Sequence, residues 1–248
     1  MKEQLQTIPV NDAMDAGDEC PFCYLQRRSE QRTIRYVAGP SASYMEPDVR
    51  AITDRHGFCA DHTKKLYDYG NTLGAALMLQ THLAGILEEF RQEMEQGKNT
   101  PKKPLFGKAP KESDYPQRIL DRVHDCYICR RMEADMQRYY KTFFVMIKDP
   151  EFRQKVEESK GFCMKHFAQL IQHAKEELPG SQHQWFYQTA YRIMEENLTR
   201  VKQDLDWLID KYDYRNVGAD WKNSRDALPR TMQKLQGLYP ADKPYVKD

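Results

Sequence analysis

The sequence lacks any long apolar run. Its most apolar stretch, from Thr72 to Leu87, is interrupted by Gln80 and His82 and is shorter than the roughly 20 apolar residues that a membrane-spanning helix needs. We therefore exclude a membrane-spanning protein. Residues 1–19 also lack an apolar segment behind a basic start, so we expect no secretory signal and place the protein in the cytoplasm.

The sequence has almost no excess of charge of either sign. Its 38 Lys and Arg residues against 37 Asp and Glu residues leave a net charge of +1, which argues against a general binder of nucleic acid. Strand signals are also missing, because no stretch alternates regularly between apolar and polar residues. Helical periodicity runs through nearly the whole chain, which predicts an all-α fold.

Cysteine is scarce, but its six residues are regularly placed. Each half of the chain has the pattern C-x2-C followed, after more than 30 residues, by G-F-C-x2-H. Three thiolates and one imidazole are the ligand set of a closed tetrahedral zinc site. The predicted metal ligands are Cys20, Cys23, Cys59 and His62 in the first half and Cys126, Cys129, Cys163 and His166 in the second.

The similarity between the halves extends beyond the ligands. The sequence E-P-D-V-R at 46–50 corresponds to D-P-E-F-R at 149–153, at a separation close to that of the cysteines. Such similarity at a fixed separation is typical of one supersecondary unit used twice. We therefore predict two pseudo-repeats, each of which gathers its own four ligands around one ion.

Other uses of the cysteines stay open. Disulfides are disfavoured in a reducing compartment and would leave the two histidines unexplained. C-P-F-C at 20–23 has the form of a redox dithiol, but no strand-like segment precedes it and the second copy lacks the proline. Among metals, zinc suits three sulfurs and one nitrogen, and an iron–sulfur cluster is the less common alternative.

The helical pattern and its interruptions predict the organisation of the chain. Long amphipathic helices, at 73–94 and around Met194 to Tyr212, are expected to pack the two repeats together. One helix is expected to run from Ile119 through the second C-x2-C to Phe144. The predicted segments are a polar tail at 1–19, a first repeat at 20–96, a Lys/Pro-rich linker at 97–116, a second repeat at 117–212 and a tail with a short helix at 213–248.

No catalytic motif emerges from the sequence. A closed Cys3His site has no open position for water or substrate, and phosphate-binding glycine loops, G-x-S-x-G and H-E-x-x-H are missing. Arg27, Arg28, Arg130, Arg131 and Lys165 lie close enough in sequence to balance the charge of the metal sites. His56 and His124 do not occupy equivalent positions in the two copies, so we do not expect them to be ligands.

At these motifs the sequence resembles an uncharacterised bacterial family of unknown function that carries a paired CxxC…GFCxxH pattern. The resemblance extends from Cys20 to about Asn216 and includes K-Y-D-Y-R-N at 211–216. It implies a duplicated, metal-binding helical protein and no established activity.

These features predict a cytoplasmic protein with two structural zinc ions that acts as a non-catalytic adaptor or regulatory module. We expect a protein partner, and neither nucleic-acid binding nor membrane insertion. The alternative is a thiolate-based redox, iron–sulfur or metal-transfer protein with one labile site. The oligomeric state is left open.

Overall fold

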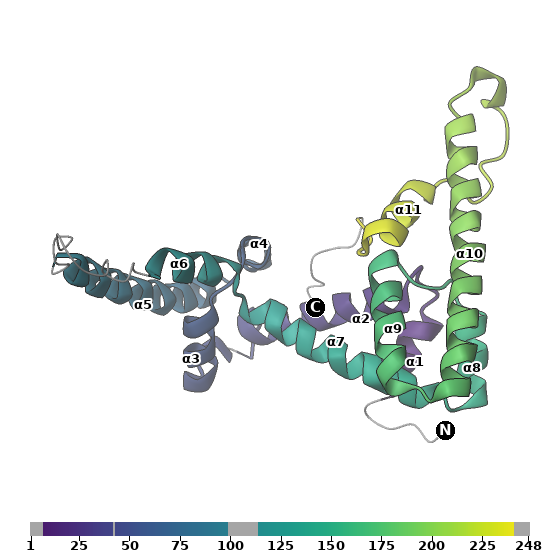
Figure 1. The fold of residues 1–248 in the computed structure, drawn as a ribbon. Coiled ribbons are helices and arrows are strands. Elements are labelled where there is room, and N and C mark those ends of the chain that lie inside the picture. The colour runs from purple at the N-terminus through teal and green to yellow at the C-terminus, as the bar shows by residue number, and fades with distance from the viewer. Residues whose placement is uncertain (1–6, 42, 99–113, 241–248) are drawn as a thin grey trace, which may run out of the picture. The chain divides into compact units, whose positions relative to one another are not determined.

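The structure is a computed structural model that describes residues 7–41, 43–98 and 114–240. These residues form helices and turns and no strand, so the all-α prediction is confirmed (Figure 1). None of the described helices is apolar over a length sufficient to cross a bilayer. The α-helices are α1 Ile8–Asp15, α2 Pro21–Ala38, α3 Pro47–His56, α4 Ala60–Tyr69, α5 Thr72–Lys98, α6 Tyr115–His124, α7 Tyr127–Met146, α8 Pro150–Glu157, α9 Met164–Glu177, α10 Gly180–Asp210 and α11 Ala227–Gln236.

The chain forms two compact units that do not coincide with its two halves. The first unit combines the chain up to Ser29 with the chain from Ala134 to the last described residue, and the second contains Glu30–Glu133. Consequently α2 begins in the first unit and ends in the second, whereas α7 begins in the second and ends in the first. The N-terminal half of the sequence therefore contributes to both units.

The first unit has the larger core. In it, α10 packs against α8, α9 and α11, and α1 packs against α8 (Figure 1). Fully buried aromatic rings fill the centre, where Phe143 makes edge contacts with Phe22, Phe144, Phe152, Phe162 and Phe186 at centroid distances between 5.4 and 6.2 Å. Edge-to-face packing of this kind adds to the stabilisation from apolar burial.

The second unit has a smaller core around the end of α2. There α5 packs against α3 and α4, and the buried side chains include Ile34, Val37, Leu66, Met78 and Ile128. Much of the apolar stripe predicted for 73–94 is not in this core. Leu73, Leu83, Leu87, Phe90 and Met94 are all exposed, so α5 presents an apolar face to the surface of its unit.

Two elements differ from the sequence prediction. The segment expected to be a polar tail contains α1, which buries Val10 and Ala13. The helix expected to run through the second C-x2-C is instead broken after His124, because Asp125 adopts extended backbone and its carboxylate accepts the N–H of Cys126 at 2.8 Å. Most of the predicted linker, at 99–113, lies outside the described residues.

The K-Y-D-Y-R-N segment forms the turn that follows α10. The side chain of Lys211 is buried, and its Nζ atom donates to the carbonyl oxygens of Asn216, Val217 and Ala219 at 2.5 to 3.3 Å. A buried ammonium group requires such partners. Lys211 therefore organises this turn, and the short helix predicted near the C-terminus follows as α11.

Candidate metal centres

The eight predicted ligand residues form two groups of four, but each group combines the two motifs. Cluster 1 contains Cys20, Cys23, Cys163 and His166, and cluster 2 contains Cys59, His62, Cys126 and Cys129. The prediction that each half closes on its own ion is therefore wrong. Each C-x2-C pairs with the G-F-C-x2-H of the other half.

Helices α2 and α7 explain why each C-x2-C pairs with the G-F-C-x2-H of the other half. At 1.5 Å per residue, α2 and α7 advance by about 27 and about 30 Å. Both begin at a C-x2-C and end in the other unit. The chain that leaves the first C-x2-C is therefore carried away from cluster 1 before it reaches Cys59. The sequence spacing alone does not reveal the direction in which those helices run.

The donor atoms of cluster 1 converge from the starts of two helices of the first unit. Cys20 precedes α2, Cys23 lies in its first turn, and Cys163 and His166 lie at the start of α9. The Nδ1 atom of His166 lies 3.3, 3.5 and 3.2 Å from the sulfurs of Cys20, Cys23 and Cys163, respectively. The sulfurs of Cys23 and Cys163 are 3.6 Å apart. All four side chains are buried.

Cluster 2 has the same local construction in the second unit. The Nδ1 atom of His62 lies 3.2, 3.4 and 3.3 Å from the sulfurs of Cys59, Cys126 and Cys129. The sulfurs of Cys59 and Cys129 are 3.8 Å apart. Burial differs from cluster 1, because Cys59 is half-buried and Cys129 is exposed.

These separations fit tetrahedral coordination. Metal–sulfur bonds of about 2.3 Å and metal–nitrogen bonds of about 2.0–2.1 Å correspond to edges of about 3.8 Å between sulfurs and about 3.6 Å between sulfur and nitrogen. A disulfide requires sulfurs about 2.05 Å apart, and all six cysteines are free. Both clusters can therefore hold a metal ion through three sulfurs and one Nδ1 atom.

The pKa values of the thiols also favour a cation bound between them. Burial, together with the neighbouring thiols, raises the pKa of Cys20 well above its ordinary value, and contact with Cys163 raises the pKa of Cys23 to about 12. In cluster 2, burial opposes ionisation of Cys126, but the hydrogen bond with His62 lowers its pKa to about 6. Three thiolates so close together repel each other unless a bound cation compensates their charge.

An aspartate supports the start of each C-x2-C. The Oδ1 atom of Asp18 accepts the N–H of Cys20 at 3.2 Å, as Asp125 does for Cys126. Each aspartate is also paired with one of the predicted basic residues, Asp18 with Arg27 and Asp125 with Arg130. The hydrogen bond from Arg130 is the main reason that the pKa of Asp125 is lowered to about 2.

The Gly-Phe pair before each third cysteine makes a tight turn. Gly57 has φ of 59° and Gly161 has φ of 74°, in the left-handed region that favours glycine. The carbonyl of Gly57 accepts the N–H of Tyr127 at 3.0 Å, so the backbone itself joins the two motifs at cluster 2. His56, which was not predicted to be a ligand, lies behind this site with its Nδ1 atom 2.7 Å from Asp125.

The two ligand histidines are oriented by different acceptors on α2. The Nε2 atom of His166 lies 3.1 Å from the side-chain oxygen of Gln26, and that of His62 lies 3.0 Å from Glu30. Lys65 pairs with the same carboxylate at 2.5 Å. Although burial opposes it, contact with His62 and Lys65 lowers the pKa of Glu30. Such contacts fix the ring orientation and leave Nδ1 as the ligand atom.

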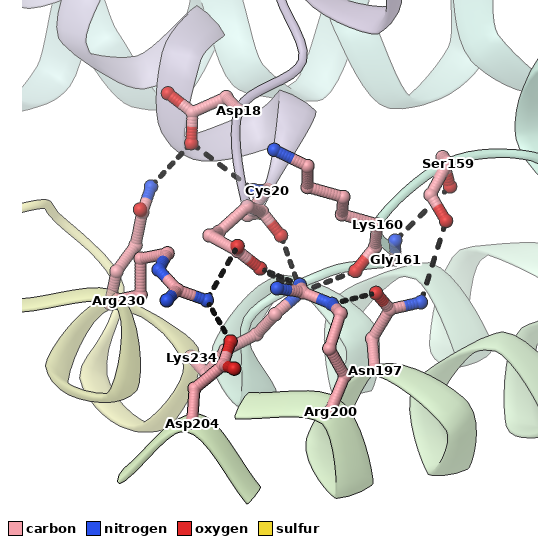
Figure 2. A network of polar contacts seen from close by, with 12 residues as sticks. Asp18, Cys20, Ser159, Lys160, Gly161, Asn197, Arg200, Asp204, Arg230 and Lys234 are labelled. Carbon is pink, nitrogen blue, oxygen red and sulfur yellow. Dashed lines mark hydrogen bonds and ion pairs between the residues drawn. The ribbon is translucent and has the colours of Figure 1, made fainter. Parts of the chain in front are cut away.

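A buried lysine holds together the two loops that carry the ligands of cluster 1 (Figure 2). The Nζ atom of Lys234 donates to the carbonyl of Glu19 at 2.6 Å and to the carbonyl of Lys160. Glu19 precedes Cys20 and Lys160 precedes the Gly-Phe-Cys turn. Lys234 also lies 3.2 Å from a carboxylate oxygen of Glu19, which pairs with Arg200 at 2.5 Å. The ammonium group thus compensates negative charge beside Cys20.

The C-terminal end of α11 covers cluster 1. Gly237 has φ of 75°, and a Cβ atom there would lie 3.5 Å from the sulfur of Cys163 and 3.7 Å from that of Cys23. The backbone N–H of Leu238 donates a hydrogen bond to Cys23. Leu238 also has positive φ, 57°, which is strained for a residue with a side chain.

Sequence reasoning missed the residues that support the ligands. Gln26, Glu30 and Lys234 are separated in sequence from the groups they contact and match no motif. A signal existed only for the acidic residue that lies one or two positions before each C-x2-C. Of the five predicted basic residues, Arg27 and Arg130 support the loops through Asp18 and Asp125. In the described part of the chain Arg28 donates instead to the hydroxyl of Tyr24, and neither Arg131 nor Lys165 is found in contact with a ligand.

Fold and site together define an all-α protein with two Cys3His clusters of metal-binding geometry. The chain belongs to the Family of unknown function (DUF6062), whose model matches residues 1–242. No curated protein and no solved structure shows a significant match to the chain.

Proposed function

We propose that the protein binds two structural zinc ions, one in each cluster. The observation that carries this proposal is the convergence of three sulfurs and one Nδ1 atom at two separate places. Zinc is favoured among metals because it accepts this donor set in a tetrahedron and needs no fifth ligand. Four protein donors leave no open position, so we propose a non-catalytic role for both ions.

Charge compensation supports the same reading. Three thiolates on Zn²⁺ leave a net charge of about −1. Lys234 lies beside cluster 1, and Lys65 lies behind the histidine of cluster 2. Each zinc–thiolate centre thus has a lysine nearby, which also pairs with Glu19 at cluster 1 and with Glu30 at cluster 2.

Elemental analysis tests the proposal. Protein purified without added metal should contain two zinc ions per chain, and the absorption of an iron–sulfur cluster should be missing. Brown colour with iron would support the alternative of an iron–sulfur or redox protein. A chain that is folded without metal would contradict a structural role.

We propose further that the protein acts as an adaptor or regulatory module that binds a protein partner in the cytoplasm. The support is an apolar surface in the second unit, the α5–α6 surface. It consists of the exposed residues Leu83, Leu87, Phe90, Ile119, Leu120 and Val123. Exposed apolar side chains grouped on neighbouring helices are typical of interaction sites. Six cysteines without a disulfide among them favour a reducing compartment.

A cavity adjoins the α5–α6 surface. It has a volume of about 680 Å³ and is lined mainly by apolar side chains, among them Phe58, Tyr67, Ile86 and Ile119. On α5, Leu83, Leu87, Phe90 and Met94 follow one another at steps of four, three and four residues. This spacing suits the apolar face of a second helix, so the proposed occupant is an amphipathic helix of the partner.

Photo-crosslinking in the native host tests this surface. A photoreactive residue at Leu87 should give a discrete adduct, and Leu83→Glu in the same chain should abolish the adduct without releasing zinc. Crosslinking unaffected by Leu83→Glu would contradict the assignment. An adduct with twice the mass of the chain would show that the partner is a second copy of this chain.

Nucleic acid is not expected to bind, and retardation of labelled DNA or RNA at low salt would contradict that expectation.

A further inference from the structure

The two clusters differ in their access to solvent. The four ligand side chains of cluster 1 are 0 to 1% exposed. In cluster 2, His62 and Cys126 are buried, but Cys59 is half-buried and Cys129 is exposed. The donor sets and the local motifs are the same, so the difference comes from what surrounds them.

Cluster 1 is enclosed on several sides. The ring of Phe22 lies 6.0 Å from that of His166 and 6.1 Å from that of Phe162, and both phenylalanines are buried. On another side Gly237 and Leu238 lie against the sulfurs of Cys163 and Cys23. An incoming ligand cannot reach this metal position unless α11 moves away.

Cluster 2 has no comparable cover among the described residues. The residues that directly follow Cys59 and Cys129 in sequence are at the surface, since Ala60, Asp61, Arg130 and Arg131 are all exposed. The sulfur side of the cluster at Cys129 therefore faces solvent. Thiolates that solvent reaches also react with dissolved ligands and reagents, whereas buried thiolates do not.

We infer that cluster 2 is an exchangeable metal site and that cluster 1 keeps its ion as long as the chain is folded. This inference rests on the proposed binding of zinc. The ligands that take the ion from cluster 2 are small molecules that bind zinc through sulfur or nitrogen, namely thiols and nitrogen chelators. Exchange breaks the bonds between Zn²⁺ and its four protein donors and forms bonds between Zn²⁺ and the incoming ligand. The freed thiolates take up protons from the solvent, and no oxidation state changes.

Zinc release from the full chain into an excess of the dye 4-(2-pyridylazo)resorcinol tests the inference. Release should be biphasic, with one equivalent leaving at least about tenfold faster than the other, as expected when accessibility controls thiolate reactivity. Iodoacetamide added during the fast phase should label Cys129 and Cys59 before the other four cysteines, as mapped by mass spectrometry.

Two substitutions assign the phases. Cys129→Ser should remove or further accelerate the fast phase and leave the slow one unchanged. Leu238→Pro removes the N–H that Cys23 accepts and cannot adopt the positive φ, so it should accelerate the slow phase only. The order in which iodoacetamide labels the six cysteines is then measured in both variants, because this measurement does not depend on the dye.

The outcomes separate this inference from the proposal on which it rests. A protein that binds fewer than two zinc ions even after loading with excess zinc and removal of the unbound ion would contradict the proposed function. Two ions that leave at the same rate, or Cys20 and Cys163 labelled as early as Cys129, would overturn the inference and leave the proposed function intact.

Discussion

At the scale of single residues, Lys234 joins the two loops that carry the ligands of cluster 1. It is buried, and burial lowers its pKa, yet it joins the loops before Cys20 and Cys163. Removal of one partner from a buried ion pair costs about 3–5 kcal/mol. We therefore expect Lys234→Ala to lower the free energy of unfolding of the zinc-loaded protein by about this amount, as measured by denaturant titration.

Lys155→Ala is the matched control for this change. Lys155 also pairs with an aspartate, Asp15 at 2.7 Å, but both side chains are exposed. Exposed pairs contribute about 0–1 kcal/mol. Equal effects of the two substitutions would show that Lys234 does not organise the loops.

Glu30 and Gln26 are expected to tune metal affinity through the histidines they orient. Loss of such a contact typically lowers metal affinity about 10- to 100-fold. Glu30→Ala should weaken cluster 2 by this factor. Glu30→Gln should weaken it less, because an amide oxygen performs the same task at cluster 1. Competition with a chelator of known affinity measures both, and an unchanged affinity in Glu30→Ala would contradict the assigned role.

At the scale of elements, the Gly-Phe-Cys turns position two ligands each. Gly57 has φ of 59° and ψ of −153°, a combination that is essentially confined to glycine. A Cβ atom there would also lie 2.6 Å from the Nε2 atom of His82. We expect Gly57→Ala to destabilise the second unit by about 1–3 kcal/mol. The measurement is thermal unfolding of the zinc-loaded protein.

Gly85→Ala provides the comparison within the same unit. Gly85 lies inside α5, and an added Cβ atom would meet nothing within 4 Å. Alanine in a helix interior is favoured over glycine by about 0.5–1 kcal/mol, so this variant should unfold at the same or a higher temperature. A Gly57→Ala variant as stable as Gly85→Ala would mean that the turn tolerates a side chain.

The helices themselves were largely predictable from the sequence, and their exceptions have local causes. Proline at 21, 47 and 150 marks helix starts, where its missing N–H costs nothing. At the break between α6 and α7, the N–H groups of Cys126 and Tyr127 donate to Asp125 and to the carbonyl of Gly57, and periodicity does not register such contacts. The sequence predicted the apolar stripe on α5, but the spacing of apolar residues does not tell which side of the helix the core covers.

At the scale of the whole molecule, the sequence predicted the ligand residues but not which of them share an ion. Residue type and spacing identified all eight side chains that the two clusters contain. Which motifs share an ion depends on where α2 and α7 end, and the tertiary structure sets the direction of these helices. The structural equivalence of the two halves stays a prediction, as do the identity of the metal and the partner.

The exchanged pairing makes each metal ion a bridge between the two halves of the chain. Cluster 1 joins Cys20 to Cys163, and cluster 2 joins Cys59 to Cys126. A protease site inserted between Lys98 and Asp114 separates the first two pairs of ligands from the last two. Metal binding that spans both fragments should hold the cleaved protein together, because the binding free energy is then part of the free energy of association.

Native mass spectrometry of the cleaved, zinc-loaded protein measures this directly. Exchanged pairing predicts one complex of both fragments with two zinc ions, which separates into metal-free fragments when a chelator removes both ions. Fragments that separate without chelator, each with one zinc ion of its own, would contradict it.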